Sequence, residues 1–276
     1  CDEACVELGM AVDTDDDNDG VLDTADAYPL RSLGELGDSD NDGAPNTCDY
    51  TCVFIKQIAD IRGEIAGDYT STTSLSADGK TIAVGAPTKI INGMKSGYVR
   101  VFINTDDGLV QLGDDINGEA DNNYFGTSVS LSEDGRTIAI GAIGQDSNGL
   151  DSGYVRIFRY TENNWLQLGQ KINGEAPGDW FGFSTSLSSD GQTLAVGAIY
   201  NNSSSGHVQV FSYSENRWLK LGEDIDGTEP GDRSGVSLDI SSDGRILAVG
   251  SMSNSGNGHA SGQVRILHYS NNHWIQ

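Results

Sequence analysis

From residue 53 onward, hydrophobic and polar positions alternate in short runs typical of β-strands. Residues 125–132 (FGTSVSLS) alternate, residues 137–142 (TIAIGA) form a short apolar run suited to burial on both faces, and residues 153–160 (GYVRIFRY) alternate again. Asp134-Gly135 is a two-residue hairpin signal between the first two runs, and a later tight turn leads to a fourth run, residues 165–172. No helical period appears, so the pattern predicts four short antiparallel strands.

This four-strand segment occurs four times at an almost constant spacing. Its Asp-Gly turns begin at positions 78, 134, 190 and 243, which are 56, 56 and 53 residues apart. A loop shortened by three residues in the third copy accounts for the smaller last step. Four strands per repeat of about 55 residues is typical of a β-propeller. We therefore predict an all-β fold in which an N-terminal module, residues 1–52, precedes a β-propeller of about four four-stranded blades, residues 53–276.

The two ends of the repeat region bear on how the blades close. Residues 54–61 align with the fourth strand of a repeat, and residues 274–276 begin the same strand again. We expect a closed four-bladed ring in which the N-terminal strand completes the last blade. A fragment of a longer propeller and strand donation between molecules remain alternatives, because an open sheet edge invites pairing with another chain.

The repeats carry a recurring Phe-Gly and Gly-Ala pattern. Phe125-Gly126 and Phe181-Gly182 are each followed by a Gly-Ala pair at the end of the central strand, and the first copy has Gly85-Ala86-Pro87. This pattern resembles the FG-GAP repeats of integrin α-subunit propellers, which implies the same architecture. The aspartate-rich calcium loop of those domains is replaced here by S-x-D-G-x-T hairpins, so we assign no metal to the propeller.

Composition narrows the range of partners. The formal net charge of −25 argues against nucleic acid, which requires a basic patch, and against an anionic membrane surface. No run of about 18 apolar residues is present, so we expect no membrane insertion. The chain begins at Cys1 without a signal peptide, which indicates a mature or trimmed product.

More than half of the charge lies in residues 1–52, where fifteen acidic residues face one basic residue, Arg31. Two stretches, residues 15–26 and 38–49, place oxygen-bearing side chains at loop positions 1, 3, 5, 9 and 12 with glycine at position 6. This spacing suits Ca²⁺, which takes six to eight oxygen ligands. A disordered acidic linker is the alternative. Pro29 and Pro45 and the absence of helical flanks argue against an EF-hand.

The same segment resembles thrombospondin type 3 repeats, through the pattern D-x-D-x-D-G-x-x-D-x-x-D followed closely by Cys or Pro. The resemblance implies calcium ions wrapped by an irregular chain. It implies side-chain ligands at two sets of positions, with the backbone carbonyls of Val21 and Ala44 joining them: Asp15, Asp17, Asp19, Asp23 and Asp26, then Asp38, Asp40, Asp42, Asn46 and Asp49. Asp13 and Asp16 are candidates for an additional ion.

All four cysteines lie in this module, at Cys1, Cys5, Cys48 and Cys52. An even count in a small, poorly hydrophobic segment predicts two disulfides and an oxidising compartment, with three connectivities open. A zinc site formed by the two C-x₃-C pairs is the alternative, as is a lipid-bearing Cys1.

No catalytic constellation is evident in the sequence. The four histidines form no ligand pair on a common strand face, and we interpret them as surface residues. Glu64, Glu119 and Glu175 occupy one repeat position, which favours a structural turn contact over carboxylate catalysis. The tryptophans at 165, 218 and 274 likewise share a position, where they are expected to pack between blades; a stacking platform for sugars is the alternative.

Ligand specificity is better sought at a position that varies. The residue six places after each repeat-opening glycine is Tyr69, Tyr124, Trp180 or Arg233, and with loops 87–96, 143–152, 199–205 and 252–261 these could line a ligand-binding rim. We interpret the chain as a non-enzymatic, extracellular or cell-surface protein of adhesion or structural assembly, with a protein or glycan partner and a calcium-stiffened N-terminal segment. A lectin-like carbohydrate-binding propeller is the alternative, and a propeller hydrolase or lyase the second alternative.

Overall fold

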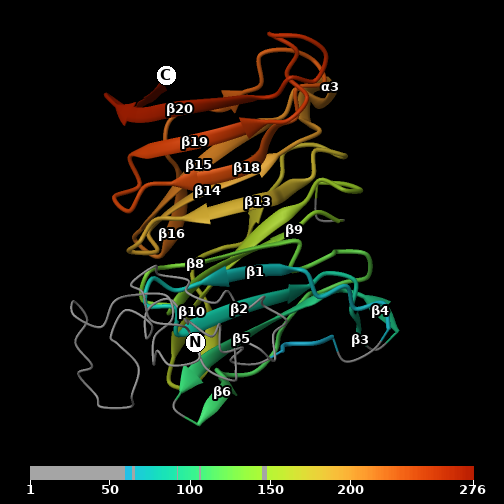
Figure 1. Ribbon diagram of the computed structural model, residues 1–276, viewed down its shortest axis with the longest axis vertical. Helices are drawn as coiled ribbons and strands as arrows, with labels where there is room; N and C mark the ends of the chain where they lie inside the picture. Colours follow the sequence, from blue (N-terminus) through green and yellow to red (C-terminus); the bar gives the residue numbers. More distant parts are fainter. Residues whose placement is uncertain (1–59, 64–65, 92, 106, 145–147) are drawn as a thin grey trace, which may run out of the picture. The chain divides into compact units, whose positions relative to one another are not determined.

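The computed structural model describes residues 60–63, 66–91, 93–105, 107–144 and 148–276 (Figure 1). The chain divides into two units, Cys1–Ile58 and Ala59–Gln276. All described residues lie in the second unit. The predicted calcium ligands, the four cysteines and most of the strand predicted at residues 54–61 lie outside them.

Each repeat folds into one antiparallel sheet, and the four sheets are numbered here in chain order. Sheet 1 comprises β1 (Thr72–Leu75), β2 (Thr81–Ala86), β5 (Tyr98–Thr105), β6 (Gly108–Gln111) and β7 (Ile116–Asn117); sheet 2 comprises β8 (Ser128–Leu131), β9 (Thr137–Ala142), β10 (Tyr154–Thr161), β11 (Asn164–Gln167) and β12 (Ile172–Asn173). Sheet 3 comprises β13 (Phe181–Leu187), β14 (Thr193–Ala198), β15 (His207–Ser214), β16 (Arg217–Lys220) and β17 (Ile225–Asp226); sheet 4 comprises β18 (Ser234–Ile240), β19 (Ile246–Ser251), β20 (Gln263–Ser270) and β21 (His273–Ile275). A small ribbon of β3 (Ile90–Ile91) and β4 (Met94–Lys95) and the single turn α3 (Asn201–Ser204) lie in loops. The predicted all-β fold of antiparallel sheets, one for each repeat, is confirmed, although sheets 1 to 3 have five strands where four were predicted.

The predicted strands and the observed ones agree best at the centre of each sheet. β9 covers the predicted residues 137–142 and is buried along its whole length. The fourth predicted strand, residues 165–172, is instead divided into β11 and β12, which both pair with β10. The division falls at Gly169, whose φ of 74° bends the chain out of the extended conformation and brings it against Trp218.

The Phe-Gly and Gly-Ala pattern marks the contact between neighbouring sheets. A Cβ on Gly141, at the end of β9, would collide with the carbonyl oxygen of Gly182 in β13. Gly182 itself has a φ of 88°. The carbonyl of Gly182 also accepts a hydrogen bond from Ser128 Oγ at 2.9 Å, and Ser184 Oγ donates in the same way to Gly235 at 2.6 Å. Both glycines are required because two backbones approach each other here without room for a side chain.

Three hydrophobic cores fill the three junctions between sheets. In the middle junction, Val155 and Ile157 of β10 pack with Phe181, Leu194 and Val196 of sheet 3. The same third-strand positions are buried in sheet 1, under sheet 2, and in sheet 3, under sheet 4. Each sheet therefore depends on the next one along the chain to cover its third strand.

The closed four-bladed ring that we expected is not formed by the described strands. Figure 1 shows the sheets following one another in chain order, with sheet 1 and sheet 4 at opposite ends of the series. β21 pairs with β20 and itself occupies the edge of sheet 4 that the N-terminal strand was expected to complete. The described strands therefore form an open series of four sheets.

Candidate functional site

The variable position predicted to line a rim has the same backbone conformation in all four repeats. Tyr69, Tyr124, Trp180 and Arg233 have φ values of 46°, 54°, 57° and 53°. Positive φ is uncommon for residues other than glycine and requires support from the surroundings. That support comes from the residue just before, which is polar and buried in every repeat: Asp68, Asn123, Asp179 and Asp232.

The buried polar residue ties the rim turn to a loop. Asp232 accepts hydrogen bonds from the Thr228 hydroxyl at 2.8 Å, the Glu229 N–H at 3.0 Å and the Asn254 side-chain amide at 3.0 Å. Burial alone would raise the pKa of Asp232, but the hydrogen bonds from Asn254, Thr228 and Glu229 hold it below its ordinary value. Asp179 accepts in the same way from Asn201 at 3.2 Å. The varying side chain is thereby held beside the loop that follows the second strand.

The rim position and the predicted loops therefore share one end of the sheets. The Trp180 N–H donates to the Asp151 carbonyl in loop 143–152, and the Arg233 N–H donates to the Ser204 carbonyl in loop 199–205. Trp180 and Arg233 thus each contact the loop of the preceding repeat, and the buried aspartate before each of them bonds to the loop of its own repeat. The sequence predicted the members of this rim but not the buried Asp or Asn that positions them, although its recurrence five residues after each repeat-opening glycine was a usable signal.

Two of the four rim residues meet in an aromatic cluster, here called the Trp180 cluster. The Trp180 and Tyr200 rings lie 4.7 Å apart at 86°, and the Arg233 guanidinium carbon lies 5.4 Å from the centre of the Tyr200 ring. Phe183 stacks with Trp180, and the centres of the two rings lie 6.3 Å apart. Among the described residues, no ring contact joins Tyr69 or Tyr124 to this cluster. A partly exposed indole, phenol and guanidinium can stack on a sugar face or hold an aromatic or anionic group.

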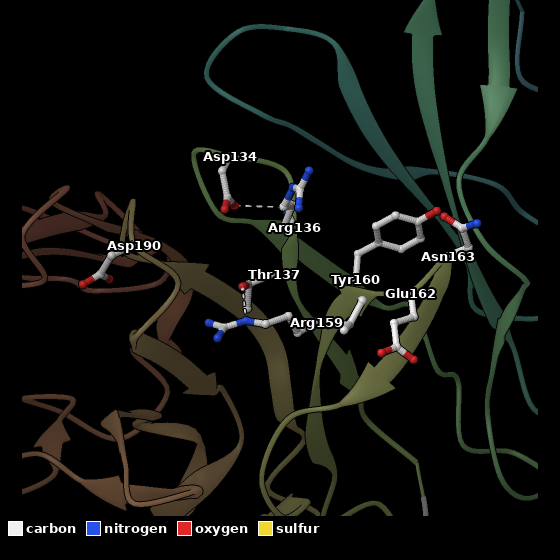
Figure 2. Close-up of a pocket in the computed structure, with 9 residues that line it drawn as sticks. Asp134, Arg136, Thr137, Arg159, Tyr160, Glu162, Asn163 and Asp190 are labelled. Carbon is white, nitrogen blue, oxygen red and sulfur yellow. Dashed lines mark hydrogen bonds between the residues drawn. The ribbon is translucent and has the colours of Figure 1, made fainter.

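At the opposite end of the sheets, the Asp-Gly hairpins line pockets that contain several charged side chains. Figure 2 shows one of them, lined by Arg136, Arg159, Tyr160, Glu162 and Asp190. Its charged groups are already engaged in the fold or spread apart: Arg159 Nε lies 3.4 Å from Thr137 Oγ1, and Asp190 and Glu162 lie on opposite sides.

The hairpins that form this end are held by their own side chains. Ser132 Oγ donates to Asp134 at 2.6 Å and accepts from the Thr137 N–H at 2.9 Å, and the other repeats have the same Ser-Asp pair. The serine and aspartate of S-x-D-G therefore stabilise the turn. The aspartate already accepts two hydrogen bonds, which for Asp134 come from the Ser132 hydroxyl and the Arg136 N–H.

The repeated tryptophans pack between sheets, as predicted. Trp165, Trp218 and Trp274 donate their Nε1–H to the carbonyls of Leu112, Leu168 and Leu221 in the preceding sheet, at 2.7, 2.9 and 3.0 Å. Trp165 and Trp218 are buried. Burial of these rings removes them as a stacking platform for sugars.

The repeated glutamates contact the following sheet where the structure describes them. Glu119 lies 3.3 Å from Arg156, and Glu175 accepts a hydrogen bond from Gln209 at 2.6 Å. Glu64 lies outside the described residues.

One histidine departs from the expectation. We interpreted all four histidines as surface residues, but His207 is buried, with 2% of its surface exposed. It begins β15, and one of its ring nitrogens, one Glu175 oxygen and one Asp224 oxygen lie within 4.8 Å of one another. The expectation was wrong because His207 occupies the place of Tyr98 and Tyr154, which are buried in the first two sheets. Among the described residues, this is the group of side chains best suited to hold a metal ion.

No helix of the described residues is long and apolar enough to cross a membrane.

Comparison with known proteins supports the architecture. The FG-GAP repeat family matches residues 117–158, which run from β7 through β10. No curated protein sequence matches the chain. The predicted resemblance to FG-GAP repeats is thus confirmed for one repeat, and the resemblance of residues 13–52 to thrombospondin type 3 repeats stays a prediction.

Several solved structures match this chain at low sequence identity. A putative 6-phosphogluconolactonase from Bacteroides uniformis is 17% identical with a TM-score of 0.50, over 73% of this chain and 51% of that one. A further match is hydrazine synthase of Kuenenia stuttgartiensis, at 13% identity and a TM-score of 0.49, over 80% of this chain and 51% of that one. Another is TolB from Acinetobacter baumannii, at 13% identity and a TM-score of 0.42, over 74% of this chain and 44% of that one. The chain spans about half the length of these structures or less. The match to the Bacteroides structure supports a propeller-like all-β fold and carries nothing about activity.

Proposed function

We propose that this chain is a non-enzymatic assembly or adhesion protein of the cell surface or extracellular space, which docks other propeller blades on the exposed apolar face of sheet 4. The observation that carries this proposal is the exposure of apolar side chains on the third strand of sheet 4. Val264 and Ile266 are 67% and 56% exposed, whereas the equivalent Val208 and Val210 are fully buried under the next sheet. Ile246 in β19 extends the same exposed apolar surface. Contiguous exposed apolar side chains of this kind mark interaction sites.

A second copy of the chain offers the complementary surface. At the other end of the series, Leu75 of β1 is 60% exposed, while Leu131, Leu187 and Ile240 at the same position are buried against the sheet before them. Sheet 4 of one copy and sheet 1 of another would repeat the junction that already occurs three times within the chain. Such a head-to-tail contact is heterologous, so it produces rings or filaments rather than a two-fold dimer.

Sedimentation velocity over a concentration series tests this assembly. We expect the full chain to associate as its concentration rises, and the variant Ile266→Lys to stay monomeric because a charge would then be buried in the contact. Leu219→Lys is the matched control, since Leu219 is half exposed on β16 and away from the open face. A monomer at every concentration, or equal association of both variants, would refute the proposal.

Calcium has its proposed role in the N-terminal module. Close carboxylates repel by about 4 kcal/mol per pair at ~4 Å and an effective dielectric near 20, so the acidic segment needs cations to become compact. We propose that Ca²⁺ at Asp15–Asp26 and Asp38–Asp49 converts it into a stiff, disulfide-linked spacer, with affinities of roughly 10⁻⁴ to 10⁻³ M that suit an extracellular location. Chelation with EDTA should make residues 1–52 sensitive to protease while the β-sheet circular dichroism is unchanged. Equal protease resistance with and without EDTA would remove calcium from the proposal.

A lectin-like function is the second candidate, and the Trp180 cluster favours it. The cluster presents aromatic faces and a guanidinium at the rim, where loops from two repeats meet. Binding on a glycan array that is lost in Trp180→Ala and kept in Tyr69→Ala would support it. Tyr69 is a suitable control because it occupies the same repeat position but is 73% exposed and lies outside the cluster. Retained binding in Trp180→Ala would exclude this cluster as the glycan site.

A further inference from the structure

The junction between sheets 2 and 3 holds a group of side chains that no other repeat has. Glu175 lies on the link between β12 and β13, His207 begins β15, and Asp224 lies between β16 and β17. Their ligand atoms are all within 4.8 Å of one another. Three separate segments of the chain therefore bring one imidazole and two carboxylates to a single point.

The other repeats have an arginine at the equivalent position. The third residue of the third strand is Arg100 in sheet 1, Arg156 in sheet 2 and Arg265 in sheet 4. Arg100 pairs with Asp115 at 2.7 Å, and Arg156 lies 3.3 Å from Glu119. Sheet 3 has Gln209 instead, which donates one neutral hydrogen bond to Glu175. The third repeat thus has two carboxylates at this point and lacks the guanidinium that pairs with one carboxylate in sheet 1 and in sheet 2.

Two atoms at this point are buried without a hydrogen-bond partner. His207 Nε2 has none among the described residues, although the side chain is 2% exposed. Asp224 Oδ1 has none either; Lys220 Nζ lies 2.7 Å from it as an ion pair but without the angle of a hydrogen bond. Buried polar groups are nearly always satisfied, and a bound ion is one of the few explanations for an exception.

We propose that Glu175, His207 and Asp224 bind a divalent transition-metal ion such as Zn²⁺. One imidazole nitrogen with two carboxylate oxygens suits zinc, cobalt and manganese, whereas calcium and magnesium prefer sites made of oxygen alone. The two carboxylates balance the charge of the ion. Three protein ligands leave a coordination position for water, and the ion connects the link before sheet 3 to two segments of that sheet.

Lys220 is the competitor for this site. Its ammonium group lies 2.7 Å from Asp224 and 3.8 Å from Glu175, so it must turn away when a metal ion enters. Lys220 is exposed enough to do so. The equivalent residues in sheets 1 and 2 are Gln111 and Gln167, which supply a substitution already accepted by the fold.

Titration of the full chain with Co²⁺ tests the site, because the d–d absorption of Co²⁺ reports nitrogen and oxygen ligands and thiolate ligands give a separate ultraviolet band. The titration is made in excess Ca²⁺, so that the acidic N-terminal loops do not compete. His207→Tyr introduces the residue found at 98 and 154, and we expect it to remove one equivalent of bound Co²⁺. Glu175→Gln and Asp224→Asn should remove the same equivalent.

Lys220→Gln distinguishes a metal site from an ion-pair network. Removing an ammonium at ~4 Å from the ion should tighten Co²⁺ and Zn²⁺ binding at least about tenfold. Zn²⁺ should also raise the melting temperature of the wild type and of Lys220→Gln but not of His207→Tyr. Equal Co²⁺ stoichiometry in wild type and in a folded His207→Tyr, or no such equivalent in both wild type and Lys220→Gln, would overturn the proposal.

Discussion

Sheets 2 and 4 have nearly the same third strand in two different surroundings. β10 and β20 share the pattern V-R-I, yet Val155 and Ile157 are fully buried while Val264 and Ile266 are mostly exposed. The hydrogen-bond register with the neighbouring central strand is complete in both sheets. The strand sequence therefore specifies the sheet, and the following sheet determines whether its apolar face is covered. An apolar sheet face that is left exposed has an energetic reason to bind another sheet.

The largest test of this comparison is the pair Ile157→Ala and Ile266→Ala. We expect the buried substitution to lower the free energy of unfolding by about 3 kcal/mol, because it removes apolar contacts and leaves a cavity between sheets 2 and 3. The exposed substitution should cost about 0.5 kcal/mol or less. Urea denaturation at low protein concentration measures both. A similar cost for Ile266→Ala would mean that the face of sheet 4 is covered in solution.

A second pair, Trp218→Phe and Trp274→Phe, compares the same inter-sheet hydrogen bond at a middle and a terminal position. Trp218 is buried and Trp274 is only partly so, although each donates Nε1–H to a leucine carbonyl of the preceding sheet. Phenylalanine keeps an aromatic ring and leaves that carbonyl unsatisfied, at a cost of about 2 kcal/mol where water is excluded. Trp274→Phe should lower the free energy of unfolding by clearly less than Trp218→Phe does. Chemical denaturation followed by circular dichroism avoids the change in tryptophan fluorescence, and equal costs would contradict the difference in burial.

Much of the fold was predictable because it depends on local pattern. The strand at residues 137–142, the hairpins at the Asp-Gly pairs and the inter-sheet role of Trp165 all follow from alternation, turn chemistry and repetition. Ring closure was not predictable, since it depends on small rotations accumulated over three junctions. The sequence contains the residues of each junction but not the angle that their packing produces.

The candidate sites were predictable only in part, for a related reason. Trp180 and Arg233 were selected because they vary among repeats, and the structure joins them through Tyr200. Asp232 was not selected, because its burial is produced by Asn254 and other groups that bond to it only in the folded chain. His207 was misjudged in the same way: a polar residue at a strand start is assumed to face water unless its tertiary neighbours are known.

Acid titration offers the smallest and most local test, at the rim end of sheet 4, where the terminal sheet is as well enclosed as the inner ones. The pKa of Asp232 is held below its ordinary value by donors from Asn254, Thr228 and Glu229, so its ionised form stabilises the fold. That stabilisation is fully present above pH ~4, the ordinary carboxyl pKa, and is lost as the pH falls through the lower pKa of the folded state. Asp232→Asn introduces the residue that sheet 2 has at Asn123, which does not titrate. Between pH 5 and pH 3 the free energy of unfolding in urea should therefore fall more for the wild type than for Asp232→Asn. The difference should be smaller than the effects of Ile157→Ala and Trp218→Phe. Parallel losses in the two proteins would show that the rim turn of sheet 4 does not depend on this carboxylate.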